Sequence, residues 1–180
     1  MIIVMGLPGA GKSTVLAVAK EKGWTVVNYG DMMMEIAKSH GIADRDSLRK
    51  LPATKQKGIQ KEVGEKLAHE KRANVILDTH CSINTPGGYL PGLPFDFLSK
   101  WQVERLVLVT APIKDILGRR SKDKTRVRDD QSHESLVEHE DINRAYLAAY
   151  SVLTGAPAAI IVNADGQLEQ TREKFAALLH

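Results

Sequence analysis

The chain has 180 residues, of which 43% are hydrophobic, and its 25 basic and 22 acidic residues give a net charge of +3. This length suits one domain with a sizeable core, and the small charge favours small anionic ligands over a broad nucleic-acid surface. The single cysteine, Cys81, excludes an internal disulfide and a cysteine-rich metal site. No apolar run approaches the roughly 20 residues that span a bilayer. Since an apolar strand is expected from residue 2, we expect no cleavable leader and a cytoplasmic protein.

The first motif along the chain is Gly6-Leu7-Pro8-Gly9-Ala10-Gly11-Lys12-Ser13, which fits the phosphate-binding loop pattern G-x-x-x-x-G-K-S/T. An apolar strand is predicted before it at residues 2–5, and a helix after it at residues 12–22. In such a loop, backbone N–H groups cradle phosphate oxygens, the lysine reaches the β- and γ-phosphates and the hydroxyl of Ser13 ligates Mg²⁺. We therefore predict a nucleoside triphosphate site made by Gly6, Pro8, Gly9, Ala10, Gly11, Lys12, Ser13 and Thr14.

The rest of the chain alternates between two kinds of pattern. Continuous apolar runs, typical of strands covered on both faces, occupy residues 25–29, 74–78, 105–110 and 159–162. Helical patterns occupy residues 31–39, 52–72, 112–121, 134–154 and 167–179. This alternation predicts an α/β fold, a doubly wound parallel sheet of about five strands with helices on both faces, as one domain over residues 1–180.

A carboxylate ends the third predicted strand, in the sequence Leu77-Asp78-Thr79-His80. Asp78 is well placed to hold Mg²⁺ through water, with the capping of a turn as the alternative. His80 could equally contact a ligand or make a structural hydrogen bond. The segment from Thr79 to Pro94 is rich in proline and glycine and follows the carboxyl end of a strand, so we expect a binding loop there.

A group of arginines follows the fourth predicted strand. Arg119, Arg120, Arg126 and Arg128 lie within ten residues of one another, and Arg144 is expected on the next helix. Guanidinium groups suit the neutralisation of charge on a transferred phosphoryl group, although most charge runs are solvated helix ends. We predict a short lid over about residues 119–133. The predicted catalytic residues are Lys12, Arg119, Arg126, Arg128 and Arg144.

The acceptor is less sharply defined by the residues alone. Arg45 and Arg49 are four residues apart, so they share a helix face and could hold a phosphate acceptor, although an exposed helix is an equal alternative. A hydroxyl acceptor would instead need a base, for which Asp31 is the candidate, but Asp31 could equally be a helix N-cap. A phosphate acceptor is favoured. A hydroxyl-acceptor kinase and a nucleotide-dependent, RNA-associated binding protein are the alternatives.

The sequence resembles the archaeal-type adenylate kinases, a trimeric, short-lid branch of the nucleoside monophosphate kinases. The resemblance rests on residues 6–13, 44–52, 78–94, 119–129 and 152–156. It implies Mg²⁺-dependent reaction of ATP and AMP to two ADP in the cytoplasm, and a homotrimer, with nucleic acid and membrane not expected as partners.

The resemblance also implies roles for particular residues. Arg119 would contact the adenine or phosphates of ATP, and the later arginines would bridge the two nucleotides. The monophosphate segment would span about residues 30–72, and the implied AMP-binding residues are Gly30, Asp31, Arg45, Arg49, Thr79 and His80. Two positions that hold arginine in bacterial enzymes are occupied here by Met34 and by the Asp-Thr-His sequence. Other histidines, His139 among them, are expected to be solvated, and Met32-Met33-Met34 is expected to pack in the core.

Overall fold

The computed structural model describes residues 1–44, 47–48, 51–69, 73–85, 87–122 and 132–179. Its strands are β1 (Ile2–Met5), β2 (Thr25–Asn28), β3 (Val75–Asp78), β4 (Ser82–Thr85), β5 (Gly88–Pro91), β6 (Arg105–Thr110) and β7 (Ala158–Val162). Its helices are α1 (Lys12–Glu21), α2 (Tyr29–Ser39), α4 (Ala53–Ala68), α5 (Phe95–Leu98), α6 (Ile113–Lys122), α7 (His133–Thr154) and α8 (Leu168–Ala176).

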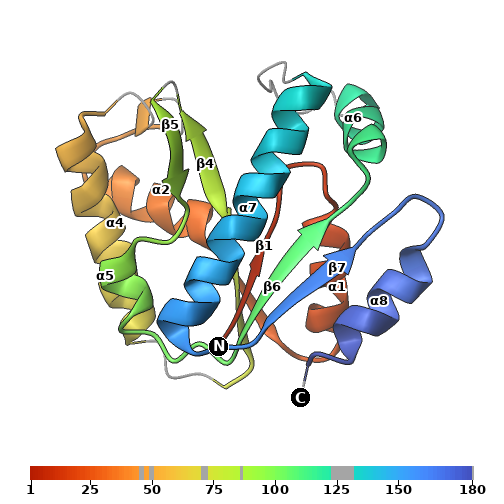
Figure 1. Cartoon of the computed structure of the whole chain (residues 1–180). Helices are drawn as coiled ribbons and strands as arrows, with labels where there is room; N and C mark the ends of the chain where they lie inside the picture. The colour runs from red at the N-terminus through yellow and green to blue at the C-terminus, as the bar shows by residue number, and fades with distance from the viewer. Residues whose placement is uncertain (45–46, 49–50, 70–72, 86, 123–131, 180) are drawn as a thin grey trace.

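Five parallel strands form the main sheet in the order β2-β3-β1-β6-β7 (Figure 1). The central strand β1 pairs with β3 on one side, where Val4 lies opposite Asp78, and with β6 on the other, where Met5 lies opposite Leu108. All five strands were predicted from their continuous apolar runs, and the predicted doubly wound α/β fold is confirmed.

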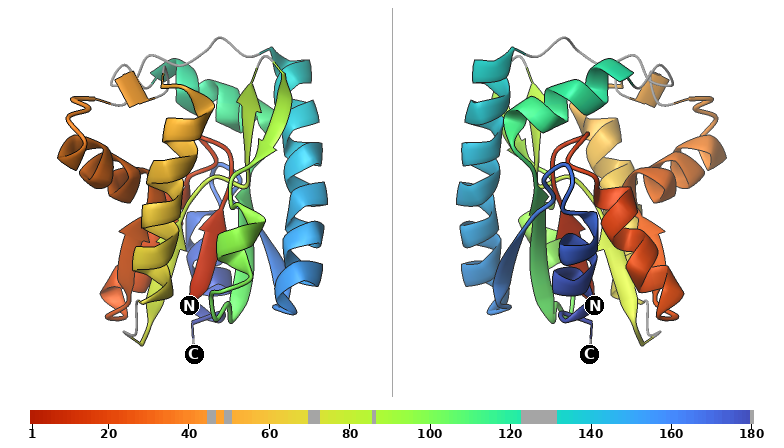
Figure 2. Two further views of the ribbon diagram at one scale, coloured as in Figure 1. Left: turned by 90° about the vertical axis from the view of Figure 1, so that its left-hand side faces the viewer. Right: turned by 90° about the vertical axis from the view of Figure 1, so that its right-hand side faces the viewer.

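Alternate side chains of the sheet enter two separate hydrophobic cores. Ile2 and Val4 pack in a core that includes Val15 of α1 and Phe175 of α8. Ile3 and Met5 face the opposite way, into a core that α4, α5 and α7 cover. Figure 2 shows α7 and α1 on opposite sides of the sheet. Burial on both faces explains why these strands read as uninterrupted apolar runs in the sequence.

Three local features differ from the predictions. The segment from Thr79 to Pro94, expected as a loop, contains the antiparallel hairpin β4–β5. Its strands lack an apolar run because side chains such as Leu90 are exposed, so their pattern resembles a loop. Helix α2 begins at Tyr29, and its N-cap is Asn28, whose Oδ1 accepts a hydrogen bond from the Asp31 backbone N–H at 3.0 Å. The prediction of Asp31 as N-cap was therefore wrong. Helix α4 is also shorter than the predicted helix over residues 52–72.

The hairpin and α6 lie beyond the carboxyl edge of the main sheet, on either side of α7 (Figure 1). Tyrosines of α7 attach the hairpin region to the helix, because Tyr146 donates to the Tyr89 carbonyl at 3.0 Å and Tyr150 to the Cys81 carbonyl at 2.8 Å. The carboxyl edge therefore gathers the glycine-rich loop, α6 and the start of α7 in one region. Within the described part of the chain, no helix is both long and apolar enough to cross a membrane.

Candidate active site

The glycine-rich loop joins β1 to α1, as the sequence predicted, and two of its glycines are required by close contacts. A Cβ atom on Gly6 would lie 2.2 Å from the carbonyl oxygen of Val109, at the end of β6. A Cβ atom on Gly11 would lie 2.1 Å from Nδ2 of Asn163, and Gly11 also has a φ of 87°. Backbone this close to its neighbours excludes every side chain larger than hydrogen.

The side chains of Lys12 and Asp78 meet where β1 and β3 end. The Lys12 Nζ donates a hydrogen bond to the Gly6 carbonyl at 3.1 Å and lies 3.7 Å from Oδ1 of Asp78. Both side chains are largely buried, with 13% and 16% exposed. Asn28 at the end of β2 donates from Nδ2 to Oδ2 of Asp78 at 2.8 Å. Three strand ends thus place one lysine and one oriented carboxylate directly beside the phosphate-binding loop.

The arrangement around Asp78 fits a Mg²⁺ ion. Its Oδ1 atom is buried and accepts no hydrogen bond from the described residues, so one carboxylate oxygen is available as a ligand. Ser13 is exposed in the first turn of α1. Mg²⁺ usually takes one or two protein oxygens together with phosphate oxygens and water. In the part of the chain described, no cluster of three or more His, Cys, Asp or Glu residues could hold a metal.

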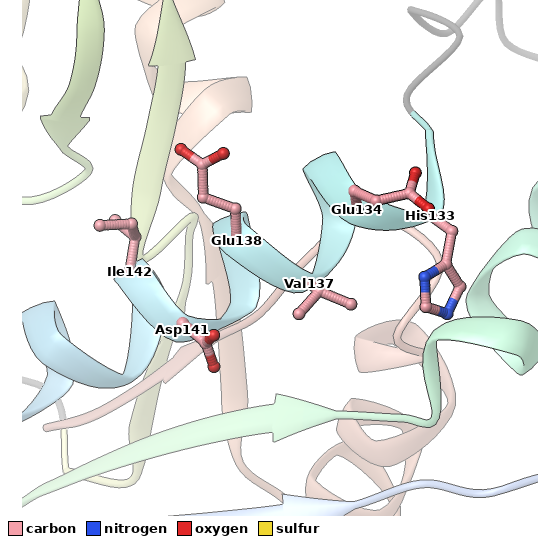
Figure 3. Close-up of a pocket in the computed structure, with 6 residues that line it drawn as sticks. All are labelled: His133, Glu134, Val137, Glu138, Asp141 and Ile142. Atoms are coloured by element: carbon pink, nitrogen blue, oxygen red, sulfur yellow. The ribbon is translucent and has the colours of Figure 1, made fainter.

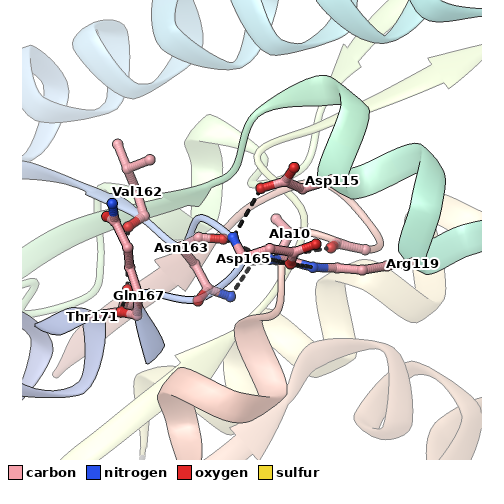
Figure 4. A network of polar contacts seen from close by, with 9 residues as sticks. Ala10, Asp115, Arg119, Val162, Asn163, Asp165, Gln167 and Thr171 are labelled. Carbon is pink, nitrogen blue, oxygen red and sulfur yellow. Dashed lines mark hydrogen bonds and ion pairs between the residues drawn. The ribbon is translucent and has the colours of Figure 1, made fainter. Parts of the chain in front are cut away.

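Two of the predicted lid arginines, Arg119 and Arg120, contact the outer side of the loop, and Figure 4 shows Arg119. Arg119, in the last turn of α6, donates to the carbonyl oxygens of Gly9 and Asn163 at 3.3 and 2.8 Å and forms an ion pair with Asp165. Arg120 donates from Nε to the Pro8 carbonyl at 2.8 Å. Arg126 and Arg128 lie outside the described residues. Arg119 therefore lies next to the phosphate-binding loop, and its role at the ATP site stays a prediction.

The buried face of α7 is polar opposite the hairpin. His139 and Asn143 meet Ser82 at the start of β4: His139 Nε2 lies 3.1 Å from Ser82 Oγ, which donates to Asn143 Oδ1 at 2.7 Å. His139 is only 6% exposed, so the prediction that it is solvated was wrong. The error has a physical cause, since the hairpin that covers this histidine was expected as an open loop. Burial lowers the pKa of His139; the hydrogen bond with the Ser82 backbone opposes that shift in part, and the nearby Arg120 adds to it.

Glu140 is a buried carboxylate that the sequence analysis missed. Neither of its oxygens makes a hydrogen bond of good geometry within the described structure, although the side chains of Thr110 and Asn143 lie close enough to lower its pKa, and Nη2 of Arg144 lies 3.6 Å from Oε1. Burial raises the pKa of Glu140, and Thr110 and Arg144 oppose that rise in part. The usable signal was its spacing, because Leu136, Glu140 and Leu147 share the inward face of one helix.

Comparison with known proteins places this geometry in a family. A family model described as "AAA domain" matches residues 5–137. The curated adenylate kinase of Methanopyrus kandleri is 45% identical over 182 residues, with 97% of this chain and 95% of the relative covered. The adenylate kinases of Methanocaldococcus jannaschii and Thermoplasma volcanium are 43% and 42% identical, with at least 97% of either chain covered in each comparison. The chain belongs to the adenylate kinase family.

Solved structures agree on the fold of this family member. A shikimate kinase from Acinetobacter baumannii matches with a TM-score of 0.61 at 20% identity, covering 99% of this chain and 92% of that one. A gluconokinase from Sinorhizobium meliloti matches with a TM-score of 0.54 at 14% identity, covering 99% and 90%. At these identities the likeness concerns the fold alone, and it confirms the kinase-like arrangement of the sheet and the phosphate-binding loop.

The residues expected at the AMP site of this adenylate kinase family member are brought together only in part. Gly30 and Asp31 lie in the first turn of α2, directly after β2. Thr79 is buried, with its backbone N–H donating to the Val4 carbonyl at 3.0 Å, and His80 follows it at the surface. Since Asn28 and Asp78 are partners in the β2–β3 register, both pairs lie at one edge of the sheet. Arg45 and Arg49 lie outside the described residues.

Two open hollows elsewhere on the surface have a different chemistry. One, of about 600 Å³, lies along the outer face of the first half of α7 (Figure 3), and another, of about 540 Å³, lies beside α2. The first is lined by His133, Glu134, Val137, Glu138, Asp141 and Ile142. The second is lined by Asp31, Met34, Glu35, Lys38, Ala43 and Asp44. Each has three carboxylates in its lining, which repel phosphate groups. The second hollow includes Asp31, which is among the residues expected at the AMP site, whereas the phosphate-binding loop is the site that suits the triphosphate.

Proposed function

We propose that this protein is an adenylate kinase, which transfers the terminal phosphoryl group of ATP to AMP, reversibly, and so makes two ADP. One observation carries the proposal: relatives named adenylate kinase are 39–45% identical to this chain over nearly its whole length. The structure supports it with a phosphate-binding loop whose lysine and nearby carboxylate lie 3.7 Å apart at the carboxyl edge of the sheet.

In this proposal the chain's own groups position phosphates and balance their charge. The loop from Gly6 to Thr14 and the Lys12 ammonium hold the triphosphate, with Arg119 at the outer side of the loop. Arg126, Arg128 and Arg144 neutralise the charge that spreads over the transferred group. Ser13 and Asp78 would hold Mg²⁺, with Asp78 acting through water; when bound, that ion screens the phosphate charge.

The acceptor side needs no catalytic base. The phosphate of AMP is already ionised at neutral pH, so it attacks without losing a proton to the protein, and arginines suit its recognition better than a carboxylate does. The proposed AMP-binding residues are Gly30, Asp31, Arg45, Arg49, Thr79 and His80. The monophosphate segment at about residues 30–72 and the short lid at about residues 119–133 would close over the two nucleotides and exclude water.

The proposal includes a cytoplasmic homotrimer, which follows from the resemblance and has one feature of the surface in its support. Val152 and Leu153 at the end of α7 are 85% and 48% exposed, and Ile160 and Val162 on the edge strand β7 are 45% and 48% exposed. Apolar side chains gathered on an edge strand and an adjoining helix end are suited to burial between subunits. Val152→Asp should convert the trimer to monomers in sedimentation, whereas a monomeric wild-type chain would refute this part of the proposal.

The decisive experiment is a matrix of nucleoside triphosphate donors against monophosphate and hydroxyl acceptors, read by product analysis. ATP and AMP alone should give two ADP, and Lys12→Ala should lower turnover by orders of magnitude while the circular dichroism spectrum stays native. Phosphorylation of a hydroxyl acceptor without ADP from AMP would support the alternative kinase with Asp31 as base. Strong, steeply salt-dependent RNA binding without transferase activity would support the binding protein instead.

A further inference from the structure

We propose that Asp165 is a positioning residue for the donor triphosphate, acting through Arg119 to hold the phosphate-binding loop in its binding conformation. Asp165 lies in the connection between β7 and α8, and within the described structure its hydrogen bonds and ion pair go to Arg119 and Asp115 and not to the loop, so its effect must pass through other groups. The inference rests on the proposed function only because it takes ATP as the phosphoryl donor. It is argued from a set of polar contacts made by Asp115, Arg119, Asn163 and Asp165, which we call the clamp (Figure 4).

Arg119 is the centre of the clamp, because its guanidinium joins two segments far apart in the sequence. Nε and Nη2 both contact the Asp165 carboxylate, and Nη2 also donates to the Asn163 carbonyl at 2.8 Å. Nη1 lies 3.3 and 3.4 Å from the carbonyl oxygens of Gly9 and Ala10. A planar guanidinium holds its N–H donors in fixed directions. Because Asp165 fixes Nε and Nη2, it also determines where Nη1 points.

Asn163 supplies the second contact with the loop. It is 6% exposed, its backbone N–H donates to the Thr110 carbonyl at 2.7 Å, and its Nδ2 donates to the Ala10 carbonyl at 2.9 Å. The Ala10 carbonyl thus receives donors from both Asn163 and Arg119. In a trans peptide the N–H points opposite to the C=O, so a fixed Ala10 carbonyl turns the Gly11 N–H away from Asn163. That N–H belongs to the set that cradles phosphate oxygens.

Asp165 is placed to hold this arrangement before any nucleotide arrives. Its backbone N–H donates to Oδ2 of Asp115 on α6 at 2.9 Å, so the connection after β7 is attached to the same helix that carries Arg119. Without the Asp165 carboxylate, Arg119 regains rotamer freedom, and its contacts with Gly9 and Ala10 are the longest that it makes. ATP binding would then have to order Arg119 and the loop, which weakens binding of the donor and leaves the acceptor unaffected.

The chain offers a matched control for a test of Asp165. Arg172 and Glu21 form another arginine–carboxylate pair, at 2.7 Å, at the opposite end of α1 from the phosphate-binding loop. The arginine side chain is 26% exposed in both pairs, and the carboxylates are similarly exposed, 59% for Glu21 and 65% for Asp165. Exposed pairs of this kind contribute little to stability, so both alanine variants should fold.

The experiment measures ATP binding by calorimetry without AMP, together with the KM values for ATP and AMP and the melting temperature. Asp165→Ala should weaken ATP binding about tenfold, the effect expected when a hydrogen bond to a charged group is lost. Its KM for AMP should stay within about twofold of wild type, since no clamp contact is lost on that side. Asp165→Asn keeps an acceptor oxygen for Arg119 and should recover part of the loss, and Glu21→Ala should leave both nucleotides unaffected.

Two results would overturn the inference. If Asp165→Ala binds ATP as wild type does, the clamp has no role in binding. If its ATP and AMP constants rise together while its melting temperature falls well below that of Glu21→Ala, Asp165 supports the fold in general. Failure of the proposed function would look different: wild-type protein would make no ADP from ATP and AMP, while the calorimetric comparison of Asp165→Ala with wild type would still decide the role of Asp165.

Discussion

Two polar regions flank the carboxyl edge of the sheet, and their hydrogen bonding differs. Around the phosphate-binding loop, the outward-facing carbonyls of Pro8, Gly9 and Ala10 all receive donors from Arg119, Arg120 or Asn163. Along α7, by contrast, Nδ1 of His139 and both oxygens of Glu140 are buried without a hydrogen-bond partner in the described structure. Apart from Oδ1 of Asp78, the polar groups around the loop are thus satisfied by the protein itself, while the α7 side carries several buried polar atoms without a hydrogen-bond partner in the described structure.

The first region is thus preorganised for binding, whereas the second contains buried polar groups that lower the stability of the protein. A network whose hydrogen bonds are made within the protein keeps its geometry before the ligand binds, so little free energy is spent on ordering it during binding. A buried polar group without a partner costs about 1–3 kcal/mol of stability, and proteins keep such groups mainly where function uses them. We therefore expect mutations in the first region to reduce donor binding, and mutations in the second region to change stability and its dependence on pH.

The largest expected effect is that of Gly11→Ala in the satisfied region. The new Cβ would meet Asn163 Nδ2 at 2.1 Å, and alanine is also strained at the φ of 87°. Either the Asn163 amide must turn away and lose its hydrogen bond to the Ala10 carbonyl, or the loop itself must move, so we expect loss of ATP binding by at least about 100-fold and destabilisation by about 3 kcal/mol. Calorimetric ATP titration and urea unfolding would measure the two effects.

Gly23→Ala is the control for that variant. Gly23 follows the other end of α1 with a φ of 78°, but nothing lies within 4 Å of a Cβ placed there. It therefore reports backbone strain alone, which costs about 1–2 kcal/mol. If Gly11→Ala is no worse than Gly23→Ala in both measurements, the close approach of Asn163 to the loop does not constrain it.

The region around the phosphate-binding loop and the region along α7 also differ in how well the sequence predicted them. The loop from Gly6 to Ser13 is a local motif, and the buried parallel strands are continuous apolar runs, so both are visible in the chain without knowledge of its neighbours. The partner of Gly11 is Asn163, about 150 residues away, and only the fold brings them together. Nothing in the local sequence around Asn163 indicates this contact.

Along α7 the burial of His139 and Glu140 was not predicted from the sequence, and the reason is physical. His139 and Glu140 stand in a charged helix and resemble solvated residues, and only the hairpin β4–β5 together with β6 buries them. The hairpin was missed because Ile83 and Leu90 are exposed and its turn formers resemble a loop. Tertiary context thus decided the burial of His139 and the pKa of both residues, and only the helical spacing of Glu140 with Leu136 and Leu147 could have indicated burial in advance.

The next effect is expected from Glu140→Gln, which should stabilise the protein at neutral pH. Because burial raises the folded-state pKa of Glu140, its stabilising contribution is complete below the unfolded pKa and is lost as pH rises through the folded value. Glutamine carries no charge, so at pH 8 the variant should be more stable than wild type by about 1–2 kcal/mol. The gap should close toward pH 4, as urea unfolding across this range would show.

Glu138→Gln is the matched control, since Glu138 is exposed on the same helix. It should leave the stability curve within about 0.5 kcal/mol of wild type. If the difference in the free energy of unfolding between Glu140→Gln and wild type stayed constant from pH 4 to pH 8, a raised pKa of a buried Glu140 carboxylate would be contradicted. Loss of activity in Glu140→Gln, with stability gained, would add that the negative charge is needed near Arg144.

A smaller effect, about 1 kcal/mol, is expected at Asn28, which lies between the two regions and performs two tasks. Its Oδ1 caps α2 and its Nδ2 orients Asp78. Asn28→Ala removes both, whereas Asn28→Ser keeps a capping oxygen and loses the contact with Asp78. Turnover should fall equally in both variants, and only Asn28→Ala should lose the stability of the cap. Equal stabilities would show that the cap contributes nothing measurable.

The smallest effect is expected from the titration of His139. Burial lowers its folded-state pKa, so the unfolded chain takes up this proton first as pH falls below about 6.5. The contribution of His139 to stability is therefore present above that pH and is lost as pH falls through the folded value. His139→Gln can still donate to Ser82 but cannot titrate, so between pH 7.5 and 5.5 it should lose less stability than the parent, by up to about 1 kcal/mol. Because Glu140 titrates with the opposite sign, the comparison belongs in a Glu140→Gln background. Parallel stability curves for the two proteins would mean that folding does not shift the pKa of His139, as for a solvated side chain.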